Sequence, residues 1–562
     1  MPSHTIATGI LLWLFSFSGK PGISRSPSPL HYPSYSVRSF GNLIAAPSFP
    51  SPQEHQKSHR HFMKHYLLFL LLLLTLPIRA QVGDLMRSTP ESQGVPSHAV
   101  EAYFDSLVSL PTELHSCILM RHGKIIGEIH PSPFSPKDGH TVYSVSKTFT
   151  AAAIGIAISE NRLRLSDRLA VFYPELLPDT ISDRLASITL RDLLTMQSGF
   201  KTTDEVRNQQ TEWIRGCLAN KITSRPGTHF SYSSMDTYLL SAIITRVTGM
   251  SLLDYLRPRI FQPLHITDYV WESSPEDMTC GGWGLYLQTE SMAKFGQLLL
   301  NRGNWKGRQL IPAGWVDEMM KLQVPGSNYG YQMWQCDNPG TARADGSFGQ
   351  FIIVMPNEDM VAVITQSAYT AGVGAKERDL LFTQLVPSLS SIALPESKAS
   401  LALQRKQATY CIPPIGGSAT SKTRDIYEKT YFFPSHPLQW QSFRLLRRGQ
   451  QLLLEIHTKD NGTVTLRCNN KSWGTSKVPV TFPPYTRSVT QGAFSGFTAP
   501  FTANSSYGWT KPTRLQIRTI FTNWMSGYYF TFNFDSSQLL YKTNYEGKWL
   551  RVNFQEKNPT AE

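Results

Sequence analysis

Residues 144–160 set a strong limit on how this chain can fold. It opens with Ser144-Val-Ser-Lys147, and residues 148–158 (TFTAAAIGIAI) are almost wholly apolar. The composition and spacing predict a helix, and a helix that is apolar on every side must be enclosed by other elements. The fold therefore has to build a core around residues 144–160.

Two hairpins are predicted on either side of this helix. Both consist of short apolar runs that flank turn residues: 117–120 with 124–126, and 351–355 with 360–364. A second helix is predicted over 235–248, with Gly249 as its stop. This order predicts an α+β fold, in which an antiparallel sheet, closed by its first and last strands, is flanked by helices and carries a helical insertion.

The character of the chain changes after this region. Residues 395–425 contain Pro395, Pro413-Pro414 and Gly416-Gly417, which indicates a linker. From about 430 onward short strand-like runs alternate with turn residues, which predicts an all-β sandwich or barrel. We therefore expect a first domain over 88–390, a linker over 395–425 and a β-rich domain over 430–562, whose role the sequence leaves open.

The N-terminal region contains two different segments. Residues 1–62 are rich in Ser, Pro and His and lack periodicity. They are either a disordered pre-region or the result of a misassigned translation start, with Met63 as the true start. Residues 63–80 have a basic head, an apolar run and a small residue before Gln81, as in a signal peptide. The run is too short to span a bilayer comfortably, so we expect an exported protein, periplasmic or secreted, without a stable membrane span.

Charge and cysteine content exclude some classes of function. The net charge is +13, but residues 1–80 hold seven Lys or Arg and one Glu, a net +6, which leaves +7 spread over the rest without a long basic run. Nucleic-acid binding is therefore not expected. The six cysteines are scattered without a CxxC and no HExxH occurs, so no metal or other cofactor is expected.

Ser144 and Lys147 form the candidate catalytic pair. Their spacing places them one helical turn apart, and burial of the following helix would desolvate Lys147, which lowers the pKa of an amine and lets it act as a base toward serine. S-x-x-K also occurs at Ser198/Lys201, in a predicted loop, and at Ser291/Lys294, in an amphipathic helix where Lys294 is expected in solvent. The competing interpretation is that Ser144 caps the helix and Lys147 is exposed.

Further motifs give the chain a family resemblance. The segment Arg225-Pro-Gly-Thr-His-Phe-Ser-Tyr232-Ser-Ser234, together with Ser144-x-x-Lys147, resembles the penicillin-recognising serine hydrolases: class C β-lactamases, D-alanyl-D-alanine peptidases and their esterase and amidase relatives. The likeness extends over roughly 88–390. It implies that Tyr232 shares proton transfer with Lys147. It also implies that Ser234 stands where the family has a substrate-binding asparagine.

The family's third motif is altered here. Lys-Thr-Gly or His-Thr-Gly corresponds to Ala344-Asp345-Gly346, followed by Ser347-Phe-Gly-Gln350. The resemblance implies an oxyanion hole formed by the backbone N–H groups of Ser144 and Ser347, with Gly346 allowing close approach of the substrate. The missing cation removes the group that grips a substrate carboxylate. Arg343 is adjacent but is expected on the opposite face of the strand.

These features predict a function with two alternatives. The A-x-G-x-x-G-Q form resembles the esterase and amide-hydrolase branch, including the nylon-oligomer hydrolases, so we expect a hydrolase that cleaves a small ester, amide or peptide through an acyl-enzyme on Ser144. True β-lactamase activity is less expected. The alternatives are a penicillin-binding protein of the D-alanyl-D-alanine peptidase type and an inactive binding module on the same fold.

Overall fold

The computed structural model describes most of the chain after the predicted signal peptide. The described residues are 85–556 apart from 202–203, 210, 369–374, 419, 422–425, 460, 480–499, 525–526 and 544–547. The predicted pre-region (1–62) and signal peptide (63–80) lie outside the described residues.

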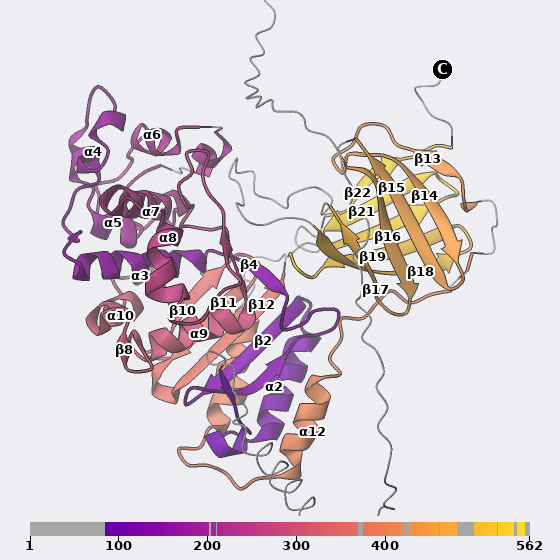
Figure 1. Ribbon diagram of the computed structural model, residues 1–562, viewed down its shortest axis with the longest axis horizontal. Coiled ribbons are helices and arrows are strands. Elements are labelled where there is room, and N and C mark those ends of the chain that lie inside the picture. The colour runs from indigo at the N-terminus through magenta and orange to yellow at the C-terminus, as the bar shows by residue number, and fades with distance from the viewer. Residues whose placement is uncertain are drawn as a thin grey trace, which may run out of the picture. The chain divides into compact units, whose positions relative to one another are not determined.

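The first domain is built on a seven-stranded sheet (Figure 1). Its strand order is β1-β3-β2-β12-β11-β10-β9. The strands are β1 (Met86–Arg87), β2 (Glu113–Arg121), β3 (Lys124–Ile129), β9 (Trp334–Gln335), β10 (Ala342–Gly346), β11 (Gln350–Met355) and β12 (Met360–Ser367). Both predicted hairpins are present, and β2 pairs antiparallel with β12. The expected closure of the sheet by early and late strands is therefore confirmed.

Helices cover both faces of this sheet because its central strands are apolar on both sides. Cys117 and Leu119 of β2 pack in one core cluster with α2 (Ser97–Ser109), and the alternating residues Ile118 and Met120 pack in the other, with α9 (Thr289–Leu300). Alternation of side chains along a strand places these neighbours on opposite faces. The sheet is thus the middle layer of an α+β domain.

The helical insertion surrounds the apolar helix. α3 (Ser146–Ser159) is buried along nearly its whole length and contacts α7 (Ser234–Thr248), α8 (Leu252–Leu256) and α10 (Ala313–Met320). α7 ends as predicted at Gly249, whose φ of 69° suits glycine. This region also contains α4 (Asp183–Ser187), α5 (Leu190–Leu194), α6 (Trp213–Leu218), the small sheet of β4 (Gly139–Tyr143), β5 (Val270–Trp271) and β6 (Leu285–Gln288), and the two-stranded sheet of β7 (Asn304–Trp305) and β8 (Arg308–Gln309).

The predicted linker region contains a helix. α12 (Lys398–Gln407) begins after Ser397, whose hydroxyl accepts a hydrogen bond from Ala399 N. It packs against α2 and β3, with Leu403 buried in the core cluster of α2 (Figure 1). A single buried residue in a ten-residue helix is too weak a periodic signal to separate this segment from the Pro- and Gly-rich residues that follow it.

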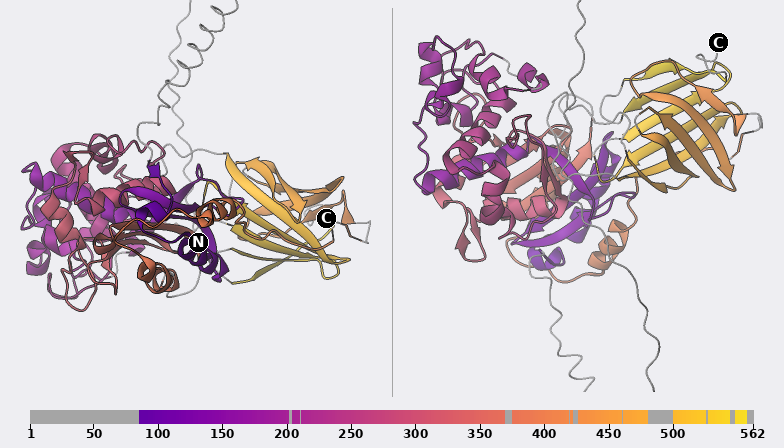
Figure 2. Two further views of the ribbon diagram at one scale, coloured as in Figure 1. Left: turned by 90° about the horizontal axis from the view of Figure 1, so that it is seen from below. Right: turned by 45° about the horizontal axis from the view of Figure 1, so that its top comes forward.

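The C-terminal region is all-β, as predicted (Figures 1 and 2). Its strands are β13 (Thr430–Phe432), β14 (Trp440–Arg448), β15 (Gln451–Thr458), β16 (Gly462–Asn470), β17 (Gly474–Val478), β18 (Phe501–Lys511), β19 (Arg514–Phe521), β20 (Gly527–Asn533), β21 (Gln538–Thr543) and β22 (Leu550–Asn553). Phe432 of the first strand and Gln555, two residues after the last strand, form an isolated bridge with reciprocal backbone hydrogen bonds of 2.7 and 3.0 Å. Of the two predicted forms, this closure matches the barrel.

Candidate active site

Ser144 lies at a sharp junction between a strand and a helix. β4 ends at Tyr143, whose φ of 49° is unusual for a residue with a side chain, and α3 begins three residues later. Val145, not Ser144, is the N-cap residue of α3, and no side-chain cap bond is made there. Ser146 Oγ donates to the carbonyl of Tyr143 and accepts from Leu285 N of β6, which fastens the junction. The competing interpretation of Ser144 as a helix cap does not fit this geometry.

Lys147 is buried beside Ser144. Its side chain is almost inaccessible, with 1% of the residue exposed. Its Nζ lies 3.0 Å from Ser144 Oγ, 3.1 Å from Ser234 Oγ and 2.6 Å from the carbonyl oxygen of Gly282. The competing interpretation expected an exposed Lys147, and this is wrong. α3 packs into the core, and Lys147 is buried as part of that helix.

Tyr232 and Ser234 come to the same place from the start of α7. Ser233 is the N-cap of that helix, and its Oγ accepts from Asp236 N at 3.2 Å. Lys147 Nζ lies 4.9 Å from the centroid of the Tyr232 ring, which lies near the rings of Tyr329 and Trp334. Tyr232 as a residue is 40% exposed. The structure thus brings Ser144, Lys147, Tyr232 and Ser234 together, and gives Ser234 a direct hydrogen bond to the lysine that the sequence did not predict.

The candidate oxyanion turn lies at the end of β10. A Cβ added to Gly346 would fall well under 3.0 Å from the carbonyl oxygen of Val142, so these two backbones are in close contact two residues before Ser144. The rings of Tyr143 and Phe348 lie 5.1 Å apart across the same boundary. The turn that carries Ser347 is therefore adjacent to the junction that carries Ser144.

Arg343 and Asp345 form an ion pair on β10, the strand that carries the altered third motif. Arg343 Nε lies 2.8 Å from Asp345 Oδ2, and Arg343 Nη1 donates to the carbonyl of Gln335 at 2.5 Å. Burial raises the pKa of the Asp345 carboxyl, and the charge of Arg343 opposes that rise. The guanidinium of Arg343 is thus bound to Asp345 on its own strand, β10, and to Gln335 on the neighbouring strand, β9. Arg343 and Asp345 lie on the same face of β10.

Asp236 is a buried carboxyl near the site that the sequence analysis did not single out. It is fully buried on α7, one turn beyond Tyr232. Burial raises its pKa to about 7, although the hydroxyls of Ser198 and Ser233 and the charge of Lys147 favour ionisation. An Asp four residues after the tyrosine is the only signal in the sequence that could have indicated it.

The other two S-x-x-K pairs are arranged differently. Lys294 is buried, with Nζ 3.4 Å from the carbonyl oxygen of His265, so its expected exposure to solvent is wrong, because the segment around His265 covers this lysine. Ser291 Oγ donates to Asp268 instead, at 2.7 Å. Ser198 is buried near Asp236, whereas Lys201 is exposed.

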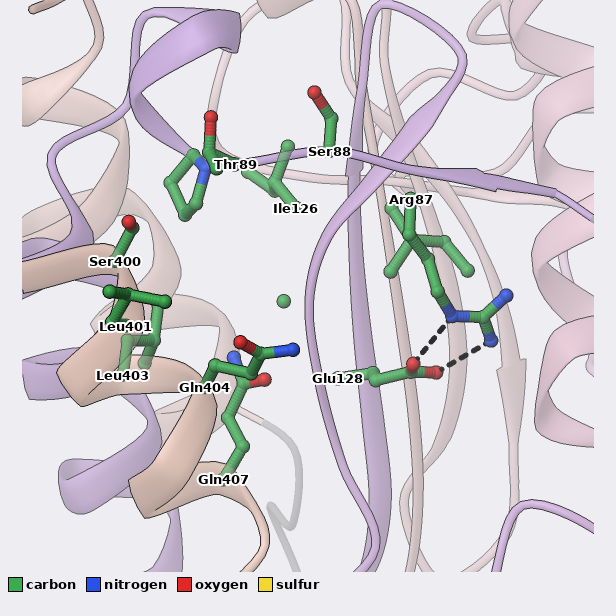
Figure 3. A pocket seen from close by; sticks show the side chains of 13 residues that line it. Arg87, Ser88, Thr89, Ile126, Glu128, Ser400, Leu401, Leu403, Gln404 and Gln407 are labelled. Atoms are coloured by element: carbon green, nitrogen blue, oxygen red, sulfur yellow. Dashed lines mark hydrogen bonds and ion pairs between the residues drawn. The ribbon is translucent and has the colours of Figure 1, made fainter. Parts of the chain in front are cut away.

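A separate cavity of about 380 Å³ lies between β1, β3 and α12 (Figure 3). Its lining includes the ion pair of Arg87 with Glu128 and the amides of Gln404 and Gln407, and none of the candidate catalytic residues.

In the described part of the chain, no group of three or more His, Cys, Asp or Glu side chains could hold a metal ion.

No single helix in the described ranges is long and apolar enough to cross a bilayer. The bent pair of helices Ser234–Thr248 and Leu252–Phe261 meets the requirements of length and composition only jointly.

Comparison with known proteins identifies the class of the first domain. Residues 116–384 match the Beta-lactamase family. The chain is 24% identical over 329 residues to the 6-aminohexanoate-dimer hydrolase of Paenarthrobacter ureafaciens, covering 50% of this chain and 83% of that protein. The chain therefore carries a Beta-lactamase family domain, with a β-lactamase/transpeptidase-like fold followed by a separate all-β domain.

Two solved structures are also similar. One is a penicillin-binding protein homologue from Caulobacter crescentus, with 16% identity, coverage of 54% of this chain and 100% of that chain, and a TM-score of 0.45. The other is the octameric penicillin-binding protein homologue from Pyrococcus abyssi, with 15% identity, coverage of 82% and 99%, and a TM-score of 0.43.

Proposed function

We propose that this protein is a serine hydrolase that cleaves a small ester, amide or peptide through an acyl-enzyme on Ser144. The observation that carries the proposal is the 3.0 Å contact between Nζ of the buried Lys147 and Oγ of Ser144 at the strand-to-helix junction. A serine hydroxyl becomes an effective nucleophile when an adjacent base takes its proton. The family match and the amide hydrolase among the relatives support the same class of reaction.

The partners of Lys147 suit both of its protonation states. A neutral amine has two N–H donors and one lone pair. The carbonyl of Gly282 and the hydroxyl of Ser234 can take the donors, which leaves the lone pair for the proton of Ser144. After that proton has moved, the ammonium has a third donor for the departing group. Burial of the amine favours the neutral form in the resting enzyme.

The reaction then proceeds by two acyl transfers. Ser144 Oγ bonds to the substrate carbonyl carbon as its proton passes to the amine of Lys147, from which Tyr232 relays a proton to the leaving group, and the N–H groups of Ser144 and Ser347 stabilise the oxyanion. The bond to the leaving alcohol or amine breaks as that group takes up the proton. Water activated by the same groups then attacks the acyl-enzyme and releases the acid, which restores the hydroxyl of Ser144.

The third-motif strand favours a substrate without a carboxylate next to the scissile bond. Ala344 occupies the position of the family's cation, and the guanidinium of Arg343 is engaged by Asp345 and the carbonyl of Gln335. This supports ester or amide cleavage over penicillin binding and D-alanyl-D-alanine peptidase activity, whose substrates carry that carboxylate. The intact Ser144 and Lys147 contact argues against the inactive binding module.

We further propose that the protein is exported to the periplasm or secreted, with residues 63–80 as its signal peptide. N-terminal sequencing of the native protein tests this. A mature chain that begins near Gln81 supports export, and a mature N-terminus well before Gln81 contradicts it.

A lysine comparison tests the proposed function directly. Lys147→Met keeps an apolar stem of similar length but removes the base, and we expect it to lower kcat for a p-nitrophenyl ester by about 10²–10⁴-fold. Lys294→Met is the matched control, because Lys294 is also a buried lysine of an S-x-x-K pair. It should stay within a few fold of wild type. Equal activity in the two folded variants would refute the assignment of Lys147.

A further inference from the structure

Two buried glutamines lie under the candidate oxyanion turn and have no part in the proposed reaction. Gln350 and Gln366 are both fully buried. Gln350 Nε2 donates to the carbonyl of Ser347 at 3.1 Å and to the carbonyl of Gln366 at 2.7 Å, and its Oε1 accepts from Gln366 N at 3.3 Å. The Gln350 side chain therefore links the turn to the neighbouring strand β12.

The second glutamine supports the first. Gln366 Nε2 donates to Glu377 Oε1 at 2.7 Å, and Glu377 is itself buried on α11 (Ala375–Leu380). A Cβ on Gly349 would overlap the amide of Gln366, so this side chain lies directly against the turn. The pairing of β12 with β2 shifts register between Thr365 and Gln366. Such irregularities redirect side chains next to active sites.

The backbone of this turn is in a conformation that needs support. Phe348 has a φ of 66° and Gly349 a φ of 91°, and Gly349 N bonds to the carbonyl of Gly346 at 3.2 Å. Phe348 is not a residue type that favours the left-handed region. A hydrogen bond to the carbonyl of Ser347 opposes rotation of the peptide that joins Ser347 to Phe348. It thereby limits the orientation of Ser347 as a whole, including its N–H.

We propose that Gln350 is a positioning residue for catalysis: its buried amide fixes the carbonyl of Ser347 so that the N–H of Ser347 points to the place where the oxyanion forms. Gln366 and Glu377 hold that amide in place. The inference rests on the proposed function, since it assigns a task to a residue behind the oxyanion hole. The side-chain amide of Gln350 donates two hydrogen bonds and accepts one, and no apolar side chain of the same size can do so.

The experiment compares Gln350→Met with Gln93→Met in the full-length protein. Gln93 is a matched control, because it is a buried glutamine whose Nε2 also donates twice, to Ser88 Oγ and Ser92 Oγ, and whose Oε1 lies 3.3 Å from His122 Nδ1. We measure kcat and KM for a p-nitrophenyl ester, the inhibition constant of phenylboronic acid, and the midpoint of urea unfolding. A boronic acid forms a tetrahedral anion on the serine and so reports on the oxyanion hole.

We expect Gln350→Met to lower kcat by about 10–100-fold with KM changed less than about threefold, since losing one oxyanion donor outright costs about 10²–10³-fold. Affinity for phenylboronic acid should fall in proportion to kcat/KM. Gln93→Met should change the unfolding midpoint comparably and leave both readouts near wild type. If Gln350→Met loses stability but keeps kcat and boronate affinity at the level of Gln93→Met, the positioning role is overturned.

Gln350→Glu keeps the test decisive if the methionine variant does not fold. An ionised carboxylate cannot donate to Ser347, whereas a protonated carboxyl can donate once. The kcat of Gln350→Glu relative to wild type should therefore rise as pH falls, and a ratio independent of pH contradicts the inference. Ester hydrolysis that persists in Ser144→Ala would instead refute the proposed function, so the two failures are distinguishable.

Discussion

Replacement of Gly346 by alanine tests the contact between the oxyanion turn and the nucleophile junction. The added Cβ would fall well under 3.0 Å from the carbonyl oxygen of Val142, and ordinary contact begins at 3.4 Å. A backbone oxygen in a strand cannot rotate away as a side chain would. The two backbones must therefore separate by about 1 Å, which moves the N–H of Ser347 away from that of Ser144.

The size of the effect follows from that displacement. A misplacement of about 1 Å at a reacting centre can cost about 10²-fold in rate, and loss of an oxyanion donor costs about 10²–10³-fold. Overpacking of a well-packed region costs about 1–3 kcal/mol of stability. We therefore expect Gly346→Ala to fold, to unfold at a lower urea concentration, and to lose about 100-fold in kcat.

The assay is steady-state hydrolysis of a p-nitrophenyl ester alongside urea unfolding. Gly296→Ala is the control, because a Cβ there would also fall under 3.0 Å from its neighbours, the side chains of Ile352 and Val361, on the sheet away from the turn. Its stability should change while its kcat stays within about threefold of wild type. Should folded Gly346→Ala keep kcat within that same range, the oxyanion hole is not at Ser347.

Three further predictions concern the surroundings of the pair. Ser234→Ala removes one of the three partners of Lys147 and should lower kcat about 10-fold, whereas Ser234→Asn should keep more activity; equal kcat in all three proteins would contradict a role for this bond. Asp236→Asn removes a carboxyl with a pKa of about 7, whose ionised form stabilises the ammonium of Lys147. The rise of kcat with pH should therefore move to lower pH in this variant. An unchanged pH profile would show that Asp236 does not affect proton transfer by Lys147. Burial and the neighbouring His115 lower the pKa of His140 to about 3, so the unfolded chain binds a proton below about pH 6.5 that the native state does not. The free energy of unfolding should then fall by about 2 kcal/mol more between pH 7 and pH 5 in wild type than in His140→Gln, and equal slopes in urea titrations would disprove it.

The fold was predictable where local patterns are strong. The apolar run after Lys147 and the two hairpins each identify one element, and antiparallel pairing of the early and late strands follows from their order. The proximity of Ser144 and Lys147 was predicted from their three-residue spacing, and the turn that leads into α3 keeps them close, since Lys147 N donates to the carbonyl of Ser144 at 3.0 Å. α12 was not predictable from the sequence, because its buried residue, Leu403, is recognisable as part of a core only once α2 is packed beside it.

The rest of the site depends on contacts between residues far apart in the sequence. Gly282 supplies the carbonyl that binds Lys147 from 135 residues away, and no motif marks it. Lys294 has the same S-x-x-K spacing as Lys147 and is also buried, so neither spacing nor burial alone identifies the pair. What distinguishes Lys147 is the 3.0 Å contact of its Nζ with the hydroxyl of Ser144, whereas the hydroxyl of Ser291 donates to Asp268.

Intact mass spectrometry after incubation with a fluorophosphonate tests whether Ser144 is the nucleophile, with wild type and Ser144→Ala compared as folded proteins. A fluorophosphonate reacts with serines that an adjacent base has activated. We predict one adduct on wild type, located on the peptide that contains Ser144, and none on Ser144→Ala. An adduct that persists in Ser144→Ala, or no adduct on wild type, would contradict Ser144 as the nucleophile.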